Sequence, residues 1–565
     1  MKEKRSIPEL LAPAGDYACF LAALSAGADA VYMGAKDFNA RAFAGGFSEE
    51  EMRDAFEKAY LCGKKIYITL NTLAFDRELK SVLNTAQRLI SYGADTFIVQ
   101  DLGIAEMLKN YFPDVILHAS TQMTCHDSQG VKLLSDLGFS RVVIAREVDG
   151  DDLRRIAEGT DTELEYFVHG ALCVSVSGQC LFSSVVGKRS GNRGECAQPC
   201  RLPYNNSYPI SLKDMCLANH VKELIDIGVA SLKIEGRMKS PSYVYSVVNT
   251  YRRLLDENRN ATNTEIEKLA SVFSRSGFSD GYFIKKIDNG MLGVRSTNDK
   301  ELTRNTNVKL KPVHRELDVI KTEERKDRLP DNIELKKSNN SSKKINSARF
   351  YNVESIPKTD YFDIVYLPLE KFVKGKANGI IMPPVIFDSE KDRVEAQLKK
   401  AKENGALHCL IGNIGALRLA EKYGFIIHGD FRLNVYNNGS MMNFDDMESV
   451  ILSPELSLAQ IRDIKGRKSI IVYGKVPLMT LEKKTGQRVL RDRKKVAFPV
   501  FKESGREIVV NSVPIYMADK DDLLKKSYIF DRHFIFTTES KDEVESVINA
   551  YKKKILSKNA VKRIK

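Results

Sequence analysis

The stretch SAGADAVYMGA, Ser25–Ala35, decides the fold. A helical segment ends at a glycine, and an apolar run without polar alternation follows it. Glycine suits the left-handed position that closes a helix, and an unbroken apolar run is typical of a strand buried on both faces. The same order recurs as SYGADTFIVQD from Ser91, DLGFSRVVIARE from Asp136 and DIGVASLKIEGR from Asp226. These repeats predict the strand–helix units of a parallel sheet.

Eight strands of this kind are expected in the first 240 residues. Most of them begin 20 to 35 residues apart, which suits a strand plus its crossover helix. Eight alternating units predict an α/β fold, a TIM-like (β/α)8 barrel over residues 1–240. The expected strands are Glu9–Pro13, Ala30–Gly34, Lys65–Asn71, Thr96–Gln100, Ile116–Gln122, Arg141–Arg146, Leu164–Gly170 and Ser231–Gly236.

The interval between the seventh and eighth strands is longer than the others and holds five of the nine cysteines. Loops that follow strand carboxyl ends carry the function of such barrels. We therefore expect the chemistry in a cysteine-rich loop, residues 171–216.

The rest of the chain resembles the first part, which indicates an internal duplication. Residues 97–125 and 409–435 both give strand, glycine, helix, strand and histidine, and residues 166–175 correspond to 471–480. The second copy has a single cysteine, Cys409, and lacks the cysteine-rich loop. The expected order is a small helical or α+β connector (241–300), a polar, partly flexible linker (301–350) and a second, degenerate barrel-like half without a cluster (351–565).

Composition limits the class of protein. The chain has 43% hydrophobic and 28% charged residues, and it contains neither a membrane-length apolar run nor an apolar segment typical of a signal peptide. We expect a cytoplasmic protein without disulfides and without a membrane partner. The net charge of +13 favours a polyanionic partner, although solvated basic faces would give the same total.

Four cysteines form the most specific pattern of the sequence. Cys173, Cys180, Cys196 and Cys200 follow the spacing Cys-x6-Cys-x15-Cys-x3-Cys, which favours a shared metal or cluster. Nearby glycines let the backbone turn tightly around a cofactor, and basic side chains offset a cluster's negative charge. Spacing favours an iron-sulfur cluster and leaves zinc as the alternative. Cys216 could replace one ligand.

The segment ELEYFVHGALCVSVSGQCLFSS from Glu163 closely resembles the signature of the collagenase-like peptidase family of unassigned catalytic type, family U32. Phe182 stands where that signature prefers a smaller aliphatic residue. LLAPAGD at Leu10, FNARAF at Phe38, GNRGECAQPCR at Gly191 and KIEGRMKSP at Lys233 are also similar to the family. The resemblance covers roughly residues 5–290, and the long two-copy layout is similar to the branch that acts on ribosomal RNA.

The resemblance implies a prephenate-dependent RNA hydroxylase with a 4Fe-4S cluster, which forms 5-hydroxycytidine in 23S ribosomal RNA. It also leaves hydroxylation of the tRNA wobble uridine open. A collagenase-like peptidase is a third possibility, although the sequence has no HExxH helix and no GxSxG elbow. The fourth is a non-enzymatic ribosome-binding scaffold with a structural metal site. The electron donor that a hydroxylase would need is not identified by the sequence.

Candidate site residues come from the carboxyl ends of the expected strands. Prephenate carries two carboxylates, which favour bidentate contacts with arginine. Lys233 and Glu235 could instead pair on one strand face, Arg146 could pair with Glu147, and His118 has a counterpart in His428, which favours a role in the fold. The catalytic candidates are His169, Glu235, Lys233 and Gln122, and the substrate-binding candidates are Arg41, Arg146, Arg201, Arg237 and His118.

Overall fold

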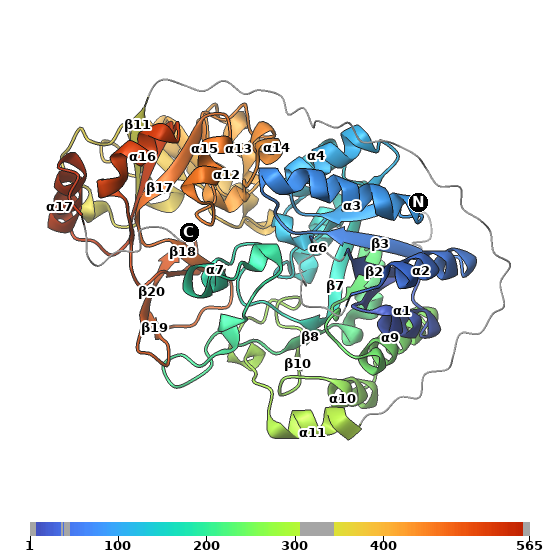
Figure 1. Cartoon of the computed structure of the whole chain (residues 1–565). Coiled ribbons are helices and arrows are strands. Elements are labelled where there is room, and N and C mark those ends of the chain that lie inside the picture. The colour runs from blue at the N-terminus through green and yellow to red at the C-terminus, as the bar shows by residue number, and fades with distance from the viewer. Residues whose placement is uncertain (1–6, 36–37, 39–45, 306–343, 557–565) are drawn as a thin grey trace.

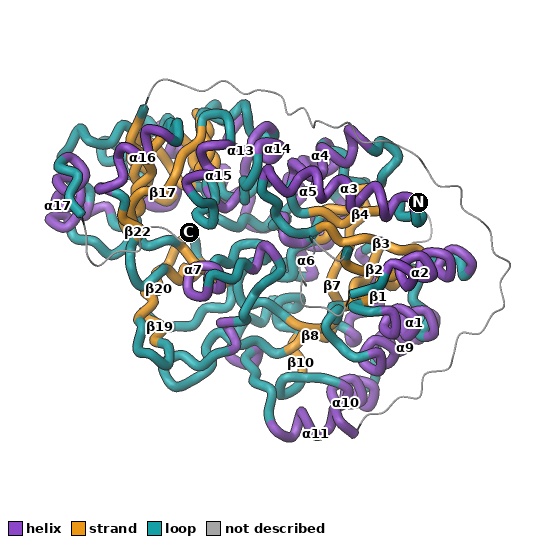
Figure 2. Tube along the Cα trace, in the orientation of Figure 1, coloured by secondary structure: helices purple, strands orange, loops and turns teal. Residues whose placement is uncertain are grey.

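The computed structural model describes residues 7–35, 38, 46–305 and 344–556. Two barrels, each a closed ring of eight parallel strands, lie side by side with α7 (Phe182–Gly187) and β18 (Pro477–Leu481) between them (Figure 1). The strands of the two rings form two separate groups (Figure 2). The predicted (β/α)8 fold and its duplication are therefore confirmed. Arg41 lies outside the described residues.

The first barrel closes because β9 pairs in parallel with both β7 and β1. Strand five and strand six end earlier than expected. The Ser120 side chain accepts the N–H of Gln122, and Thr124 takes a left-handed conformation, so a 3₁₀ turn at Thr121–Met123 replaces the end of the fifth strand. The strands of the ring are β1 (Glu9–Ala14), β2 (Ala30–Gly34), β3 (Lys65–Leu70), β4 (Thr96–Val99), β5 (Ile116–Ala119), β6 (Arg141–Val143), β7 (Glu163–Ala171) and β9 (Ser231–Ile234).

Helices surround this ring in the expected alternation. Gly27, Gly93, Gly138 and Gly228, the glycines of the sequence repeat, all have positive φ and close the helices before them, as the sequence predicts. The helices are α1 (Tyr17–Ser25), α2 (Glu49–Leu61), α3 (Leu79–Ser91), α4 (Leu102–Tyr111), α5 (Ser128–Asp136), α6 (Gly150–Glu158), α8 (Val221–Ile227) and α9 (Pro241–Asp256), followed in the connector by α10 (Asn263–Val272) and α11 (Thr297–Asn305).

The second barrel repeats the first in strand order and closes in the same way, through the pairs β17–β23 and β11–β23. Tyr473 of β17 pairs antiparallel with Tyr516 of β22 (Ile515–Tyr516), as His169 of β7 does with Cys216 of β8 (Asp214–Cys216). The structural register therefore makes His169 equivalent to Tyr473 and Gly170 to Gly474, one residue from the ungapped match of 166–175 with 471–480. The strands are β11 (Ile345–Phe350), β12 (Ile364–Pro368), β13 (Gly379–Ile381), β14 (His408–Ile411), β15 (Ile426–Gly429), β16 (Ser449–Ile451), β17 (Lys468–Gly474) and β23 (Asp531–Phe536).

The helices of the second half are shorter on average than those of the first. β11 begins at Ile345, within the last residues of the segment expected to be a linker, and residues 306–343 of that segment are outside the described chain. The helices are α12 (Lys391–Glu403), α13 (Ala416–Lys422), α14 (Asn438–Met442), α15 (Leu458–Asp463), α16 (Asp521–Lys526) and α17 (Lys541–Lys552). Among the described helices, none has the length and apolar character that a membrane crossing requires.

Where the first barrel has its cysteine-rich loop, the second has an antiparallel sheet of four strands in the order β18–β21–β20–β19. Its edge strand β18 lies against the cysteine loop: the carbonyl oxygens of Thr480 and Leu478 each accept a backbone N–H, from Val176 and Leu181, at 2.8 Å. The second half thus covers the loop of the first. The other strands are β19 (Val489–Arg491), β20 (Ala497–Glu503) and β21 (Arg506–Val510).

Equivalent positions of the two copies meet in the interface between the barrels. A Cβ on Gly103 would lie 2.4 Å from Oδ1 of Asn437, and a Cβ on Gly415 would lie 2.2 Å from Oδ1 of Asp127. These two glycines correspond in the alignment, as do the two side chains that they contact. Burial raises the pKa of Asp127 to about 7. The close approach of backbone to side chain requires glycine on both sides of this pseudo-symmetric contact.

Candidate functional site

A cavity of about 1170 Å³, part of which is open to solvent, lies where the strand carboxyl ends of the first barrel meet the cysteine loop. Cys173, Cys180, Cys196 and Cys200 all line it. Met479 of β18 completes the wall, so the second half contributes to the site. Five other sequence candidates line the same cavity: Gln122, Arg146, Lys233, Glu235 and Arg237.

The four cysteines reach the cavity from different parts of the loop. Cys173 follows the end of β7, Cys180 precedes α7, and Cys200 lies in a 3₁₀ turn at Pro199–Arg201. The backbone N–H of Gln198 donates to Sγ of Cys196 over 3.3 Å, a contact that stabilises a thiolate or a metal-bound sulfur. The four cysteines of the sequence pattern therefore all border one cavity.

Burial and the neighbouring cysteines raise the pKa values of the Cys180 and Cys200 thiols. Burial raises the pKa of the Cys180 thiol well above its usual range, and the three other cysteines raise it further. Burial, reinforced by Cys173 and Cys196, raises the pKa of Cys200 to about 12. Both thiols are protonated at neutral pH, so a metal that binds them must displace protons. All nine cysteines are free, and in the described ranges no three His, Cys, Asp or Glu side chains stand as ligands of one metal ion.

Buried contacts hold the cysteine loop in place. The Arg201 guanidinium donates to the carbonyl oxygens of Leu172, over 2.6 Å, and Leu212, and therefore ties the start of the loop to its end. Burial lowers the pKa of Arg201. Arg201, a candidate for substrate binding, is thus engaged by the loop itself and is outside the cavity lining. Gly178 fits against the backbone of Gln122, where a Cβ would lie 2.1 Å from the carbonyl oxygen.

An ion-pair network inside the barrel supports the cavity floor. Nζ of Lys233 donates to Oε1 of Glu165 over 2.7 Å, and Oε2 of Glu165 accepts from Arg141 over 3.3 Å. Burial lowers the pKa of Lys233, although Glu165 opposes this shift. Lys233 also lies 4.5 Å from the centre of the Tyr32 ring. Its carboxylate partner is therefore Glu165 on the neighbouring strand rather than Glu235, the pairing that the sequence left open.

Arginine side chains border the same space. The guanidinium of Arg146 lies 4.0 Å above the Phe167 ring and donates to the carbonyl oxygen of Ala171 over 3.2 Å. Glu147 accepts the N–H of Ser177 over 2.9 Å instead of pairing with Arg146. Arg237 donates to Thr69 Oγ1 over 2.7 Å. Both arginines present positive charge to the cavity, as a dicarboxylate ligand would require.

The two histidine candidates lie away from this cavity. His169 is packed among the rings of Tyr243, Tyr251 and Phe278, and burial lowers its pKa to about 3. His118 lies edge-on to Tyr67, with ring centres 4.8 Å apart, and borders a different cavity near the amino ends of the strands. Burial also lowers its pKa. Both rings are therefore neutral at physiological pH and belong to the packed barrel.

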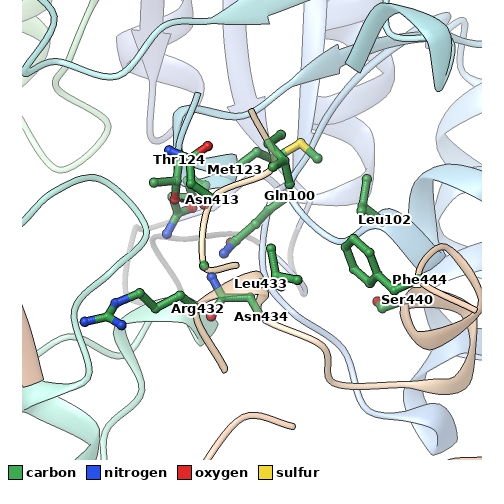
Figure 3. Close-up of a pocket in the computed structure, with 13 residues that line it drawn as sticks. Gln100, Leu102, Met123, Thr124, Asn413, Arg432, Leu433, Asn434, Ser440 and Phe444 are labelled. Carbon is green, nitrogen blue, oxygen red and sulfur yellow. Dashed lines mark hydrogen bonds between the residues drawn. The ribbon is translucent and has the colours of Figure 1, made fainter. Parts of the chain in front are cut away.

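A second, smaller cavity of about 450 Å³ lies between the two barrels and shares Gln122 with the first. Figure 3 shows Met123 and Thr124 of the first half on one side, and Arg432 and Asn434 of the second half on the other. Gln122 Oε1 is buried and has no hydrogen-bond partner within the described chain. Sequence reasoning missed Arg432, although the alignment of the copies places it opposite Gln122.

The fold and the site together place this chain in the class of duplicated (β/α)8 barrels that have a cysteine-lined cavity in one copy. The model of peptidase family U32 matches residues 15–292. The "Collagenase" of Porphyromonas gingivalis is 35% identical over 313 residues, which cover 49% of this chain and 73% of that protein. The chain belongs to peptidase family U32, and the resemblance noted in the sequence is confirmed.

Two further relatives have names that refer to RNA. The "23S rRNA 5-hydroxycytidine C2501 synthase" of Escherichia coli is 42% identical over 259 residues, which cover 44% of this chain. The "tRNA hydroxylation protein P1" of Bacillus subtilis is 36% identical over 266 residues, again 44% of this chain. The matches span 39% of the length of the first relative and 63% of the second.

Proposed function

We propose that this chain is an RNA hydroxylase that forms 5-hydroxycytidine in 23S ribosomal RNA. The observation that carries the proposal is the single cavity in which four cysteines meet a lysine and two arginines. The relative that is 42% identical and named for this modification supports the choice of RNA and base. An RNA target of this kind would place the protein in the cytoplasm.

The cofactor we propose is a 4Fe-4S cluster held by Cys173, Cys180, Cys196 and Cys200. Thiolates are the ligands of such clusters, and the N–H that Gln198 donates to Cys196 fits a metal-bound sulfur. When bound, a cluster would supply electron transfer next to the substrate. A zinc ion, the alternative, would be held by the same four thiolates.

Prephenate is the co-substrate we propose, bound as a dicarboxylate by Arg146 and Arg237. The Arg146 guanidinium donates to the carbonyl oxygen of Ala171, and its buried Nε has no hydrogen-bond partner among the described residues, so Arg146 can also donate to a carboxylate. Arg237 donates to Oγ1 of Thr69 and lines the same cavity. Lys233 adds a buried positive charge beneath them. Contacts between a guanidinium and a carboxylate are charge-assisted and can be bidentate, which favours a dicarboxylate ligand here.

Hydroxylation of the tRNA wobble uridine is the second candidate, supported by the relative named for tRNA hydroxylation. One experiment separates the two. The gene is deleted from its host, and nucleosides from purified 23S ribosomal RNA and from tRNA are quantified by mass spectrometry. We expect loss of 5-hydroxycytidine from ribosomal RNA, restored by the wild-type gene and not by Cys173→Ala. Loss of 5-hydroxyuridine from tRNA alone would favour the second candidate, and unchanged spectra of both RNAs would exclude hydroxylation.

A further inference from the structure

The antiparallel sheet of the second half connects the cysteine-lined cavity to a basic edge. β18 contacts the cysteine loop and provides Met479 to the cavity wall. β19 forms the opposite edge of the sheet (Figure 1). Three strand spacings of about 4.8 Å put that edge roughly 14 Å from β18. The sheet is therefore long enough to reach from a base in the cavity to the neighbouring nucleotides of the same strand.

The segment from residue 484 to 495, which we call the basic hairpin, contains β19 and the turn that follows it. Its single acidic residue, Asp492, is half-buried, and Oδ1 of Asp492 accepts the backbone N–H groups of Lys494 and Val496 over 2.8 and 2.9 Å. That carboxylate therefore stabilises the turn. Within the part of the chain that the structure describes, no ion pair involves the exposed cations of the hairpin: Lys484, Arg488, Arg491, Arg493, Lys494 and Lys495.

Hydrogen bonds fix the basic hairpin to the loop that bears the cysteines. The backbone N–H of Asn205 donates to the carbonyl oxygen of Arg491, and Oδ1 of Asn205 accepts the N–H of Arg491, both over 3.0 Å. Nδ2 of Asn205 donates to the carbonyl oxygen of Val489 over 2.8 Å. Asn205 follows Cys200 closely in the chain. The cations are thus held at a defined place relative to the cavity, and their side chains face solvent.

We propose that the basic hairpin binds the phosphate backbone of RNA beside the nucleotide whose base enters the cysteine-lined cavity. This inference rests on the proposed function, because it takes RNA as the substrate. An enzyme that modifies a base inside a small cavity must hold that base out of its stack, and contacts to the flanking backbone hold the strand while it does so. Unpaired surface cations gain affinity for phosphates by releasing the counterions of the nucleic acid.

The test compares two triple variants of the full chain that lower the net charge equally. The first is Arg491→Gln, Arg493→Gln and Lys494→Gln in the hairpin. The control is Lys399→Gln, Lys400→Gln and Lys541→Gln, three exposed lysines on α12 and α17 that lie outside the basic hairpin. Binding of a fluorescein-labelled single-stranded RNA of the 23S target sequence is measured by anisotropy between 50 and 300 mM KCl.

The hairpin variant is expected to bind this RNA roughly 100-fold more weakly at 0.1 M salt, and the slope of log Kd against log salt should fall by about 2. The control should keep the wild-type slope and affinity, and equal melting temperatures would show that both variants fold. Equal affinity and slope for hairpin variant and control would overturn the inference, as would a wild-type chain that does not bind this RNA. If the wild type binds and the hairpin contributes as expected, but no hydroxycytidine forms, the proposed function alone fails.

Discussion

Replacing Gly178 by alanine is expected to displace the cysteine loop without changing a cysteine. Gly178 has φ of +77°, and an added Cβ would lie 2.1 Å from the carbonyl oxygen of Gln122. The left-handed conformation costs an alanine about 1–2 kcal/mol, and overpacking against backbone costs about 1–3 kcal/mol more. Neither cost can be relieved unless the backbone moves. The backbone is held in place because the carbonyl oxygen of Gly178 accepts a hydrogen bond from Nδ2 of Asn434 over 3.3 Å. The loop segment that carries Cys180 should therefore shift.

The assay is thermal unfolding together with the iron content of anaerobically purified protein. At about 2–4 °C per kcal/mol for a domain of this size, Gly178→Ala should lower the Tm by at least about 4 °C and reduce the iron bound per chain. Gly187→Ala, in the same loop, is the matched control, because an added Cβ meets no atom within 4 Å and φ is not positive. Equal Tm and equal iron content in the two variants would refute the reasoning.

Three further substitutions test the barrel and its cavity. Glu165→Gln leaves Lys233 and Arg141 without their shared buried carboxylate and should lower the free energy of unfolding by about 3–5 kcal/mol in urea titrations; a loss under about 1 kcal/mol would contradict the network. The pKa of His169 lies near 3 in the folded chain and near 6.5 in the unfolded chain, so protons favour unfolding as the pH falls through this window. Wild type should therefore lose about 2 kcal/mol more than His169→Phe between pH 7 and pH 5, and identical pH profiles would show that the ring titrates normally. Arg146→Gln should weaken prephenate binding, measured by calorimetry, roughly tenfold to hundredfold, whereas an unchanged Kd would remove this arginine from the ligand site.

Local chemistry explains why the fold could be predicted from the sequence. Helix-closing glycines such as Gly27 and Gly228 and the apolar runs after them need no tertiary information, and all eight strands of the first ring were found from them. The fifth strand ends at Ala119 and not at the predicted Gln122, because Ser120 caps a turn that ends at the left-handed Thr124. The hydrophobic pattern of the sequence does not reveal such a turn. The duplication can be predicted because both copies repeat the order of strand, glycine, helix, strand and histidine.

The site was predictable only in part. Cysteine spacing identified four side chains that do line one cavity, and strand carboxyl ends identified Lys233 and Arg237. Sequence position cannot show which partner a side chain finds, so Arg201 was assigned to a substrate although it binds the carbonyl groups of its own loop. It also cannot show that Met479, more than 270 residues beyond Cys200, completes the wall. The sheet that carries Met479 has no counterpart in the first copy.

Quantification of iron and acid-labile sulfide in anaerobically purified protein tests the central claim most directly. If the four cysteines hold one cluster, the wild type should contain about four irons and four sulfides per chain, and Cys173→Ala and Cys200→Ala should each lose them. A matched Cys409→Ala variant, whose thiol is buried in the second barrel, should keep them. One zinc per chain in place of iron, or iron that persists in both cysteine variants, would contradict the claim.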